Sequence, residues 1–215
     1  MTQHLRILTA VALVATALLS LLWTLLEPPL PAEGLLTALA DGGTSVAASG
    51  LLFAFAQLLF AVGMVGLGCW LRSASPRLAA TGASFGVLGA FGHTLWAGVM
   101  LVQIVMAADA ANHDVHAALV ADLEASLLFL PFSMLGLAGT VLGVLLLSIA
   151  LWRSRRAPRW AAPALWAFLL VEFVGTSLSD WATYVSGVLY LAAFAALAAR
   201  IATERADVPT PAPTA

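Results

Sequence analysis

Six long apolar stretches constrain what this chain can fold into. Each reaches the roughly 20 residues that a helix needs to cross a hydrocarbon core of about 30 Å. Their apolar character is continuous, without the alternation of a membrane barrel strand, and this favours helices. We therefore expect an all-α, polytopic membrane protein, a bundle of six transmembrane helices. The predicted spans cover residues 7–26, 46–71, 78–107, 126–152, 160–179 and 183–200.

The composition supports a membrane location. Hydrophobic residues make up 62% of the chain, mean hydropathy is +1.00, and only 9% of the residues are charged. Soluble domains carry roughly 25% charged residues. The chain has too little polar surface for a water-soluble domain, so the lipid bilayer is its first expected partner.

The residue types that are missing exclude several chemistries. The nine basic residues are all arginine, so a Schiff base on lysine and a lysine-dependent phosphate loop are excluded. Cys69 is the only cysteine, which excludes intrachain disulfides, thiol relays and iron–sulfur clusters. The net charge of −2 and the scattered arginines argue against nucleic acid as a partner.

The arginines indicate the orientation in the membrane. All nine fall on one side of the predicted spans, where two carboxylates of the tail reduce their charge to +7. Eight carboxylates in the opposite segments give that side −8. Because positively charged loops stay in the cytoplasm, we expect both termini to be cytoplasmic. The arginines are Arg6, Arg72, Arg77, Arg153, Arg155, Arg156, Arg159, Arg200 and Arg205.

The two ends of the chain allow specific expectations. Residues 1–26 could be interpreted as a signal peptide, with a small-residue cleavage motif at residues 38–40. The apolar run is longer than a typical signal core and the motif lies well beyond it, so we interpret the segment as a span. The tail, residues 203–215, is proline-rich and polar, and we expect it to be disordered.

Small residues recur at helical spacing in two of the predicted spans. Helices in lipid associate through close contact, and small residues allow their backbones to approach. The sequence therefore predicts glycine-lined faces that pack helix on helix, or that serve a homo-oligomer. These glycines are Gly82, Gly86 and Gly89 in the third span, and Gly136, Gly139 and Gly143 in the fourth.

Glu172 is the most informative residue inside the predicted spans. It lies about 11 residues into the fifth span, roughly 17 Å from the inner end at 1.5 Å per residue. A carboxyl group at this depth must be protonated, paired or facing water. Gly175, Thr176 and Ser179 continue its helical face toward the outer surface. We expect Glu172 and Thr176 to bind a proton or a small cationic or polar ligand.

His93 and Gln57 reach a similar depth in two other spans. His93 lies roughly 22 Å from the inner end of the third span, counted at 1.5 Å per residue. An imidazole near neutrality beside a carboxylic acid suits proton relay. Each residue also has a structural alternative, because Glu172 could bond a neighbouring helix, His93 could be a satisfied interior histidine, and Gln57 could join two helices. The sequence does not fix the helix arrangement that decides whether they meet.

Asp109, His113 and His116 form a second candidate cluster, outside the predicted spans. If residues 108–118 continue as one helix, the three fall at i, i+4 and i+7 on one face. One carboxylate and two imidazoles can bind zinc or another divalent metal, and the alternative is a solvated acidic loop. The sequence disfavours bis-histidine haem, because His93 is the only histidine well inside a span.

The stretch Leu151–Ala164 (LWRSRRAPRWAAPA) is a basic loop, punctuated by proline, that opens the fifth predicted helix. Together with the other short, arginine-flanked inner loops, it resembles uncharacterised six-helix bacterial integral membrane proteins of the domain-of-unknown-function type. The resemblance implies no activity and no site residues. The absence of lysine with abundant alanine, leucine and arginine is typical of a GC-rich bacterial gene, and we expect a multi-pass protein of the bacterial cytoplasmic (inner) membrane.

Three hypotheses follow for function. The first is a non-enzymatic membrane protein that binds or moves a small solute or protons with Glu172, helped by His93. The second is a structural or regulatory membrane subunit whose polar residues only organise the bundle. The third is a membrane-embedded enzyme with a metal site in the outer Asp/His loop.

Overall fold

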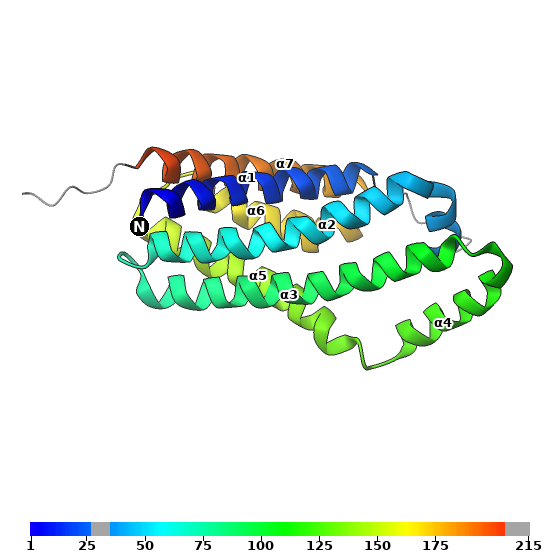
Figure 1. Ribbon diagram of the computed structural model, residues 1–215. Helices are drawn as coiled ribbons and strands as arrows, with labels where there is room; N and C mark the ends of the chain where they lie inside the picture. Colours follow the sequence, from blue (N-terminus) through cyan, green and yellow to red (C-terminus); the bar gives the residue numbers. More distant parts are fainter. Residues whose placement is uncertain (27–34, 205–215) are drawn as a thin grey trace, which may run out of the picture.

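The computed structural model describes residues 1–26 and 35–204 of the 215-residue chain, and in them the fold is all-α (Figure 1). Two short 3₁₀ helices, η1 and η2, interrupt a series of α-helices. The α-helices of the described residues are α1 (Gln3–Leu26), α2 (Leu35–Leu71), α3 (Pro76–Ala107), α4 (His113–Ala125), α5 (Leu130–Ser154), α6 (Ala161–Phe173) and α7 (Trp181–Thr203). The 3₁₀ helices are η1 (Ala110–Asn112) and η2 (Gly175–Ser177).

Five helices in the described part of the chain are long and apolar enough to cross a membrane, namely α1, α2, α3, α5 and α7. Their lengths follow from uninterrupted runs of alanine, leucine, valine and glycine, in which each backbone group is satisfied within the helix. The prediction of an all-α protein with several membrane-length helices is confirmed.

The segment predicted as the fifth span, residues 160–179, is shorter than expected. Its α-helix, α6, has 13 residues, about 20 Å at 1.5 Å per residue, and η2 follows it. The α-helix ends where Val174 leaves helical geometry, with φ −122° and ψ −44°, and Gly175 follows it. In the turn that follows, the hydroxyl of Thr176 donates to the Glu172 carbonyl and that of Ser177 to the Val174 carbonyl, each at 2.6 Å. A sixth full-length α-helical span is therefore not confirmed.

Helix α2 begins earlier than predicted, at Leu35 instead of residue 46. A kink at Gly43 separates the first turns from the rest of the helix, with φ +50° and ψ −127°. Side chains of L-residues rarely adopt this backbone conformation, so glycine is required for the bend. At the other end of the chain α7 extends to Thr203, and the tail predicted to be disordered lies outside the described residues from position 205 on.

Six helices form a closed ring. Each packs on the next in chain order, α1 on α2, α2 on α3, α3 on α5, α5 on α6 and α6 on α7, and α7 returns to α1. Figure 1 shows α1 and α7 side by side, so that both ends of the described chain belong to neighbouring helices. Helix α4 stands outside the ring, where it contacts α3. A ring of this kind has an interior to which all six helices can contribute.

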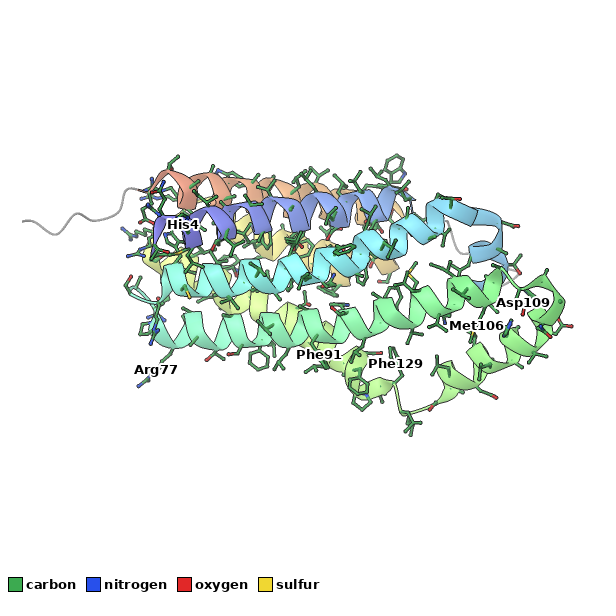
Figure 2. All side chains as sticks on the ribbon, viewed as in Figure 1. His4, Arg77, Phe91, Met106, Asp109 and Phe129 are labelled. Carbon is green, nitrogen blue, oxygen red and sulfur yellow. The ribbon has the colours of Figure 1, made fainter. Side chains whose placement is uncertain are left out.

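The two ends of the ring differ in charge. Figure 2 shows His4 and Arg77 at one end of the bundle and Asp109 at the other. Arginines gather at the end of the ring where α1, α3 and α6 begin. Arg156, in the connection from α5 to α6, joins this connection to the last turn of α2, because its guanidinium donates to the Trp70 carbonyl at 2.7 Å. The arginines of the described residues, all at this end, are Arg6, Arg72, Arg77, Arg153, Arg155, Arg156, Arg159 and Arg200. We call this the arginine end and the opposite one the aspartate end.

Glycines bring α3 and α5 into backbone contact. A Cβ on Gly92 would overlap the backbone nitrogen of Gly136, and a Cβ on Gly89 would overlap that of Thr140. A Cβ on Gly143 would lie 2.5 Å from the nitrogen of Gly86. The predicted glycine faces therefore pack on each other within one chain.

The interior of the ring is solid in the half nearer the arginine end. Large apolar side chains from five of the six helices fill it, and each is at most 2% exposed. They are Leu13, Met64, Leu67, Leu147, Leu151, Leu165, Phe194, Leu197 and Ile201, with Ala79 and Ala90 from α3 beside them. A pocket of about 530 Å³ at this end is lined by the last turn of α5, the connection to α6 and the first turn of α6.

Candidate functional site

The half of the ring nearer the aspartate end encloses a cavity of about 340 Å³, which we call the ring cavity. All six ring helices line it, α1 and α2 through residues 20–24 and 53–60, α7 through residues 183–190. Its size is that of a pocket for a small organic molecule. The polar residues in its lining are Ser20, Thr24, Gln57, His93, Ser133, Thr140, Glu172, Thr183, Ser186 and Tyr190.

Three of the four residues predicted to form the polar site line this one cavity. Gln57 comes from α2, His93 from α3 and Glu172 from α6. Gln57 is buried, whereas His93 and Glu172 are partly exposed, as expected of side chains that border an open space. Residues far apart in the sequence thus line one cavity.

Thr176, the fourth candidate, is not in the lining. Its side chain is bonded to the Glu172 carbonyl and it is exposed. The prediction extrapolated the helical face of Glu172 by four residues, but α6 ends at Phe173 and the 3₁₀ turn directs Thr176 differently. The grouping of Thr176 with the cavity residues is wrong for this reason.

Glu172 is bonded to Ser186 across the contact of α6 with α7. The Ser186 hydroxyl lies 2.5 Å from Oε2 of Glu172 and 2.8 Å from the Thr183 carbonyl, and Ser186 is 1% exposed. A hydroxyl has one proton to donate. When Ser186 donates to the carboxylate, Glu172 is ionised, and when it donates to Thr183, a protonated Glu172 donates to Ser186. The same three groups therefore accommodate both protonation states of Glu172.

Aromatic rings surround the polar groups of the cavity. Phe53 lies edge-on to His93, with ring centroids 5.9 Å apart and an interplanar angle of 88°. The same ring contacts Trp96 at 5.4 Å and Trp23 at 4.6 Å. The aromatic residues of the lining are Trp23, Phe53, Phe60, Trp96, Phe168, Phe173 and Tyr190.

Two polar atoms of the cavity lining are buried without a hydrogen-bond partner. They are Nε1 of Trp23 and Oγ1 of Thr140. A buried polar group without a partner costs about 1–3 kcal/mol. Groups of this kind in a cavity wall are available to a bound molecule or to water.

Trp23 was not among the residues predicted for the site. A tryptophan near the end of a span is typical of the aromatic belt at the membrane surface. The cavity lies in that same half of the ring, so a residue near the end of α1 faces the interior. The spacing of Ser20, Trp23 and Thr24 on one helical face was the available signal.

The outer Asp/His candidates are only partly brought together. The chain does not continue α3 past Ala107, since Asp109 has φ −91° and ψ 80° and η1 precedes α4. His116 lies 3.2 Å from the Asp109 carboxylate, whereas His113 is 3.8 Å from Asp114. The described residues contain no group of three metal-binding side chains. The condition of one continuous helix is not met, because the backbone turns at Asp109.

Asp109 still occupies a distinct local environment. Hydrogen bonds from the side chains of Asn112 and His116 hold the pKa of its carboxyl below the ordinary value. Asp109 directly follows α3 and His116 lies in α4, so the contact between them joins the end of α3 to α4. We interpret it as a contact that holds the loop in place.

Comparison of the chain with models of protein families, with curated proteins and with solved structures finds no match. The geometry of the ring cavity therefore carries the functional argument.

Proposed function

We propose that this protein binds a small solute in the ring cavity and moves it across a membrane, with Glu172 as the group that binds the solute or a proton. The observation that carries the proposal is the meeting of Glu172, His93 and Gln57, from three helices, around one cavity of about 340 Å³. Ionisable groups inside a membrane are costly and are retained for such functions.

The proposed membrane topology has six spans with both termini in the cytoplasm of a bacterium. Five spans are the long helices, and α6 continued by η2, residues 161–177, forms a short sixth. The arginines at one end of the ring support a cytoplasmic position for that end. The ring cavity then lies in the half of the bundle nearer the outer side of the inner membrane.

The chemistry follows from the cavity groups. Glu172 supplies a negative charge or, when protonated, a proton, and Ser186 adapts to either state. His93 offers ring nitrogens that can donate or accept a hydrogen bond. Gln57 offers both a donor and an acceptor to a polar solute. These groups together suit a cation or a proton-coupled polar solute.

The difference between the two halves of the ring, one packed and one holding the cavity, supports movement by alternation between two states. The half of the ring near the arginine end is filled by apolar side chains, so the structure is closed there. Release toward that side requires the packed half to open while the other half closes. A binding site near the middle of the bundle is the arrangement that such a cycle uses.

Glu172→Gln in proteoliposomes tests the proposal, because glutamine keeps the size of the side chain and removes its charge and proton. Vesicles loaded with a pH-sensitive dye receive amines, amino acids and sugars in turn. We expect a response to one class in the wild-type protein and its loss in Glu172→Gln, with unchanged helix content. An equal response in both proteins contradicts the proposal. It favours a structural subunit, in which the Ser186–Glu172 bond only joins α6 to α7.

A further inference from the structure

We propose that the ligand of the ring cavity is an amphiphilic organic cation, whose ammonium head lies beside Glu172 and whose apolar chain occupies a second, adjoining cavity. This inference rests on the proposed function of the ring cavity and names the chemical class of its ligand. It is carried by the charge of the lining, its aromatic rings and the adjacency of the two cavities.

The charge of the lining favours a cationic head. Glu172 is the one carboxylate, and no arginine lines the cavity within the described residues, in a chain without lysine. An ionised carboxylate in a water-poor site needs an opposite charge. A monovalent cation supplies it, whereas an anionic head would meet Glu172 without any compensating arginine.

The aromatic rings favour an organic ammonium over a metal ion. The described residues provide no group of three metal-binding side chains, but aromatic residues from α1, α2, α3, α6 and α7 border the cavity. The faces of tryptophan, tyrosine and phenylalanine attract weakly hydrated cations, as in cages for quaternary ammonium groups. Trp23, Phe53 and Trp96 lie in the lining and pack on one another, with centroid distances of 4.6 and 5.4 Å from the central ring.

A second cavity of about 450 Å³ adjoins the first and is mostly apolar. It lies between the first turns of α2, the outer half of α3 and the connection from α4 to α5, with Leu39, Met100 and Phe129 in its wall. Trp96 and Ser133 line both cavities. From Trp96 to Gln103 the second cavity follows α3 for about 10 Å at 1.5 Å per residue.

The two cavities share Trp96 and Ser133 in their walls, and this adjacency favours an elongated ligand. The first compartment is polar and aromatic with a single carboxylate and the second is mostly apolar, so one molecule that fills both needs a charged end and a hydrocarbon end. Leu127, in the wall of the second cavity, is 78% exposed, so this compartment borders the surface that faces lipid. An amphiphile can enter from the bilayer along this side.

Binding of three octyl compounds that differ only in the head group tests the inference. Octyltrimethylammonium, octyl sulfate and octyl glucoside are titrated by calorimetry into the full-length protein in zwitterionic nanodiscs, with empty nanodiscs subtracted. Tetramethylammonium measures the head alone. We expect the octyl cation to bind at least about tenfold more tightly than each other probe, because it uses both the carboxylate and the apolar cavity.

Variants test which cavity binds the ammonium head and which binds the apolar chain. Glu172→Gln should weaken both ammonium probes about tenfold, since cation binding loses its counter-charge. Val99→Phe fills the second cavity and should weaken the binding of the octyl cation only. Val102, on the same helix, is 54% exposed, and Val102→Phe should leave the affinity for every probe unchanged. Val102→Phe also reports whether an added ring on α3 is tolerated.

Each outcome decides between the inference and the proposed function. Tight binding of the sulfate or the glucoside with weak binding of the cation overturns the inference and leaves the ring cavity as a binding site. Equal affinities for the octyl cation and tetramethylammonium overturn the assignment of the second cavity. Absence of binding by every probe, together with no solute response in proteoliposomes, overturns the proposed function itself.

Discussion

The Ser186 hydroxyl on α7 lies 2.5 Å from Oε2 of Glu172 on α6, so the one carboxyl group of the ring cavity is held by a neighbouring helix through a side chain that is 1% exposed. The bond fixes the direction of Glu172. The carboxyl group lines the cavity in this position, and its other oxygen remains available to a ligand.

A double-mutant cycle tests this relationship. Ser186→Ala and Glu172→Ala each remove one side of the bond, and we expect a coupling of about 1 kcal/mol in the free energy of unfolding. Unfolding in mixed micelles, followed by circular dichroism, measures it. Strictly additive effects would contradict a hydrogen bond between the two side chains.

Glycine packing between α3 and α5 gives a prediction with a matched control. Gly92→Ala places a Cβ into the backbone of Gly136, and we expect a destabilisation of about 3 kcal/mol or failure to fold. Gly98, on the same helix, has no atom within 4 Å of a Cβ, so Gly98→Ala should stabilise by about 1 kcal/mol through helix propensity. Thermal unfolding in detergent compares them. Similar melting temperatures would refute the contact.

The unpartnered hydroxyl of Thr140 predicts an unusual stability effect. Thr140→Val keeps the shape of the side chain and removes a buried oxygen without a partner, so the protein should be as stable as the wild type or more stable. The control is Thr16→Val, because Thr16 donates to the Ala56 carbonyl at 2.8 Å, and it should cost about 1–2 kcal/mol. The same unfolding assay serves both. A larger loss at Thr140 would mean that its hydroxyl is already satisfied.

The pKa of Asp109 predicts an acid-sensitive contact between α3 and α4. Asn112 and His116 lower this pKa in the folded protein. Their contribution to the free energy of unfolding is therefore present above the ordinary aspartate pKa of about 3.9, and it is lost as the pH falls through the lowered pKa. Asn112→Ala and His116→Ala should each raise it toward the ordinary value, the first by more. Carbon-13 NMR of labelled aspartate measures the titration, and an unchanged midpoint in both variants would rule out the contact.

The long helices could be predicted from the sequence because hydrocarbon length is read directly from hydropathy. Residues 78–107 were expected for α3, which runs from Pro76 to Ala107. The early end of α6 could not be read in this way, since it lies at Val174, where the backbone leaves helical geometry. A change of backbone angles at an apolar residue leaves hydropathy unchanged. It is visible only in three dimensions.

The sequence predicts the level of each candidate residue along its helix, but not the direction in which its side chain points. Glu172, His93 and Gln57 were expected at similar levels, because each residue adds 1.5 Å along a helix. Whether they face each other depends on helix rotation, which the glycine contact of α3 with α5 sets. Trp23 was not predicted for the same reason, since a position near a helix end does not state which way the side chain points.

Water access to position 172 tests the central claim most directly. Cys69 is the only cysteine, so Cys69→Ser provides a background in which Glu172→Cys and Leu170→Cys each carry a single thiol on α6. Leu170 is 66% exposed and does not line the cavity, which makes it the lipid-facing control. A permanently charged methanethiosulfonate reagent reacts with thiols that water reaches. We predict rapid modification of Glu172→Cys and little of Leu170→Cys in folded protein in nanodiscs, and the reverse order would contradict a polar cavity inside the ring.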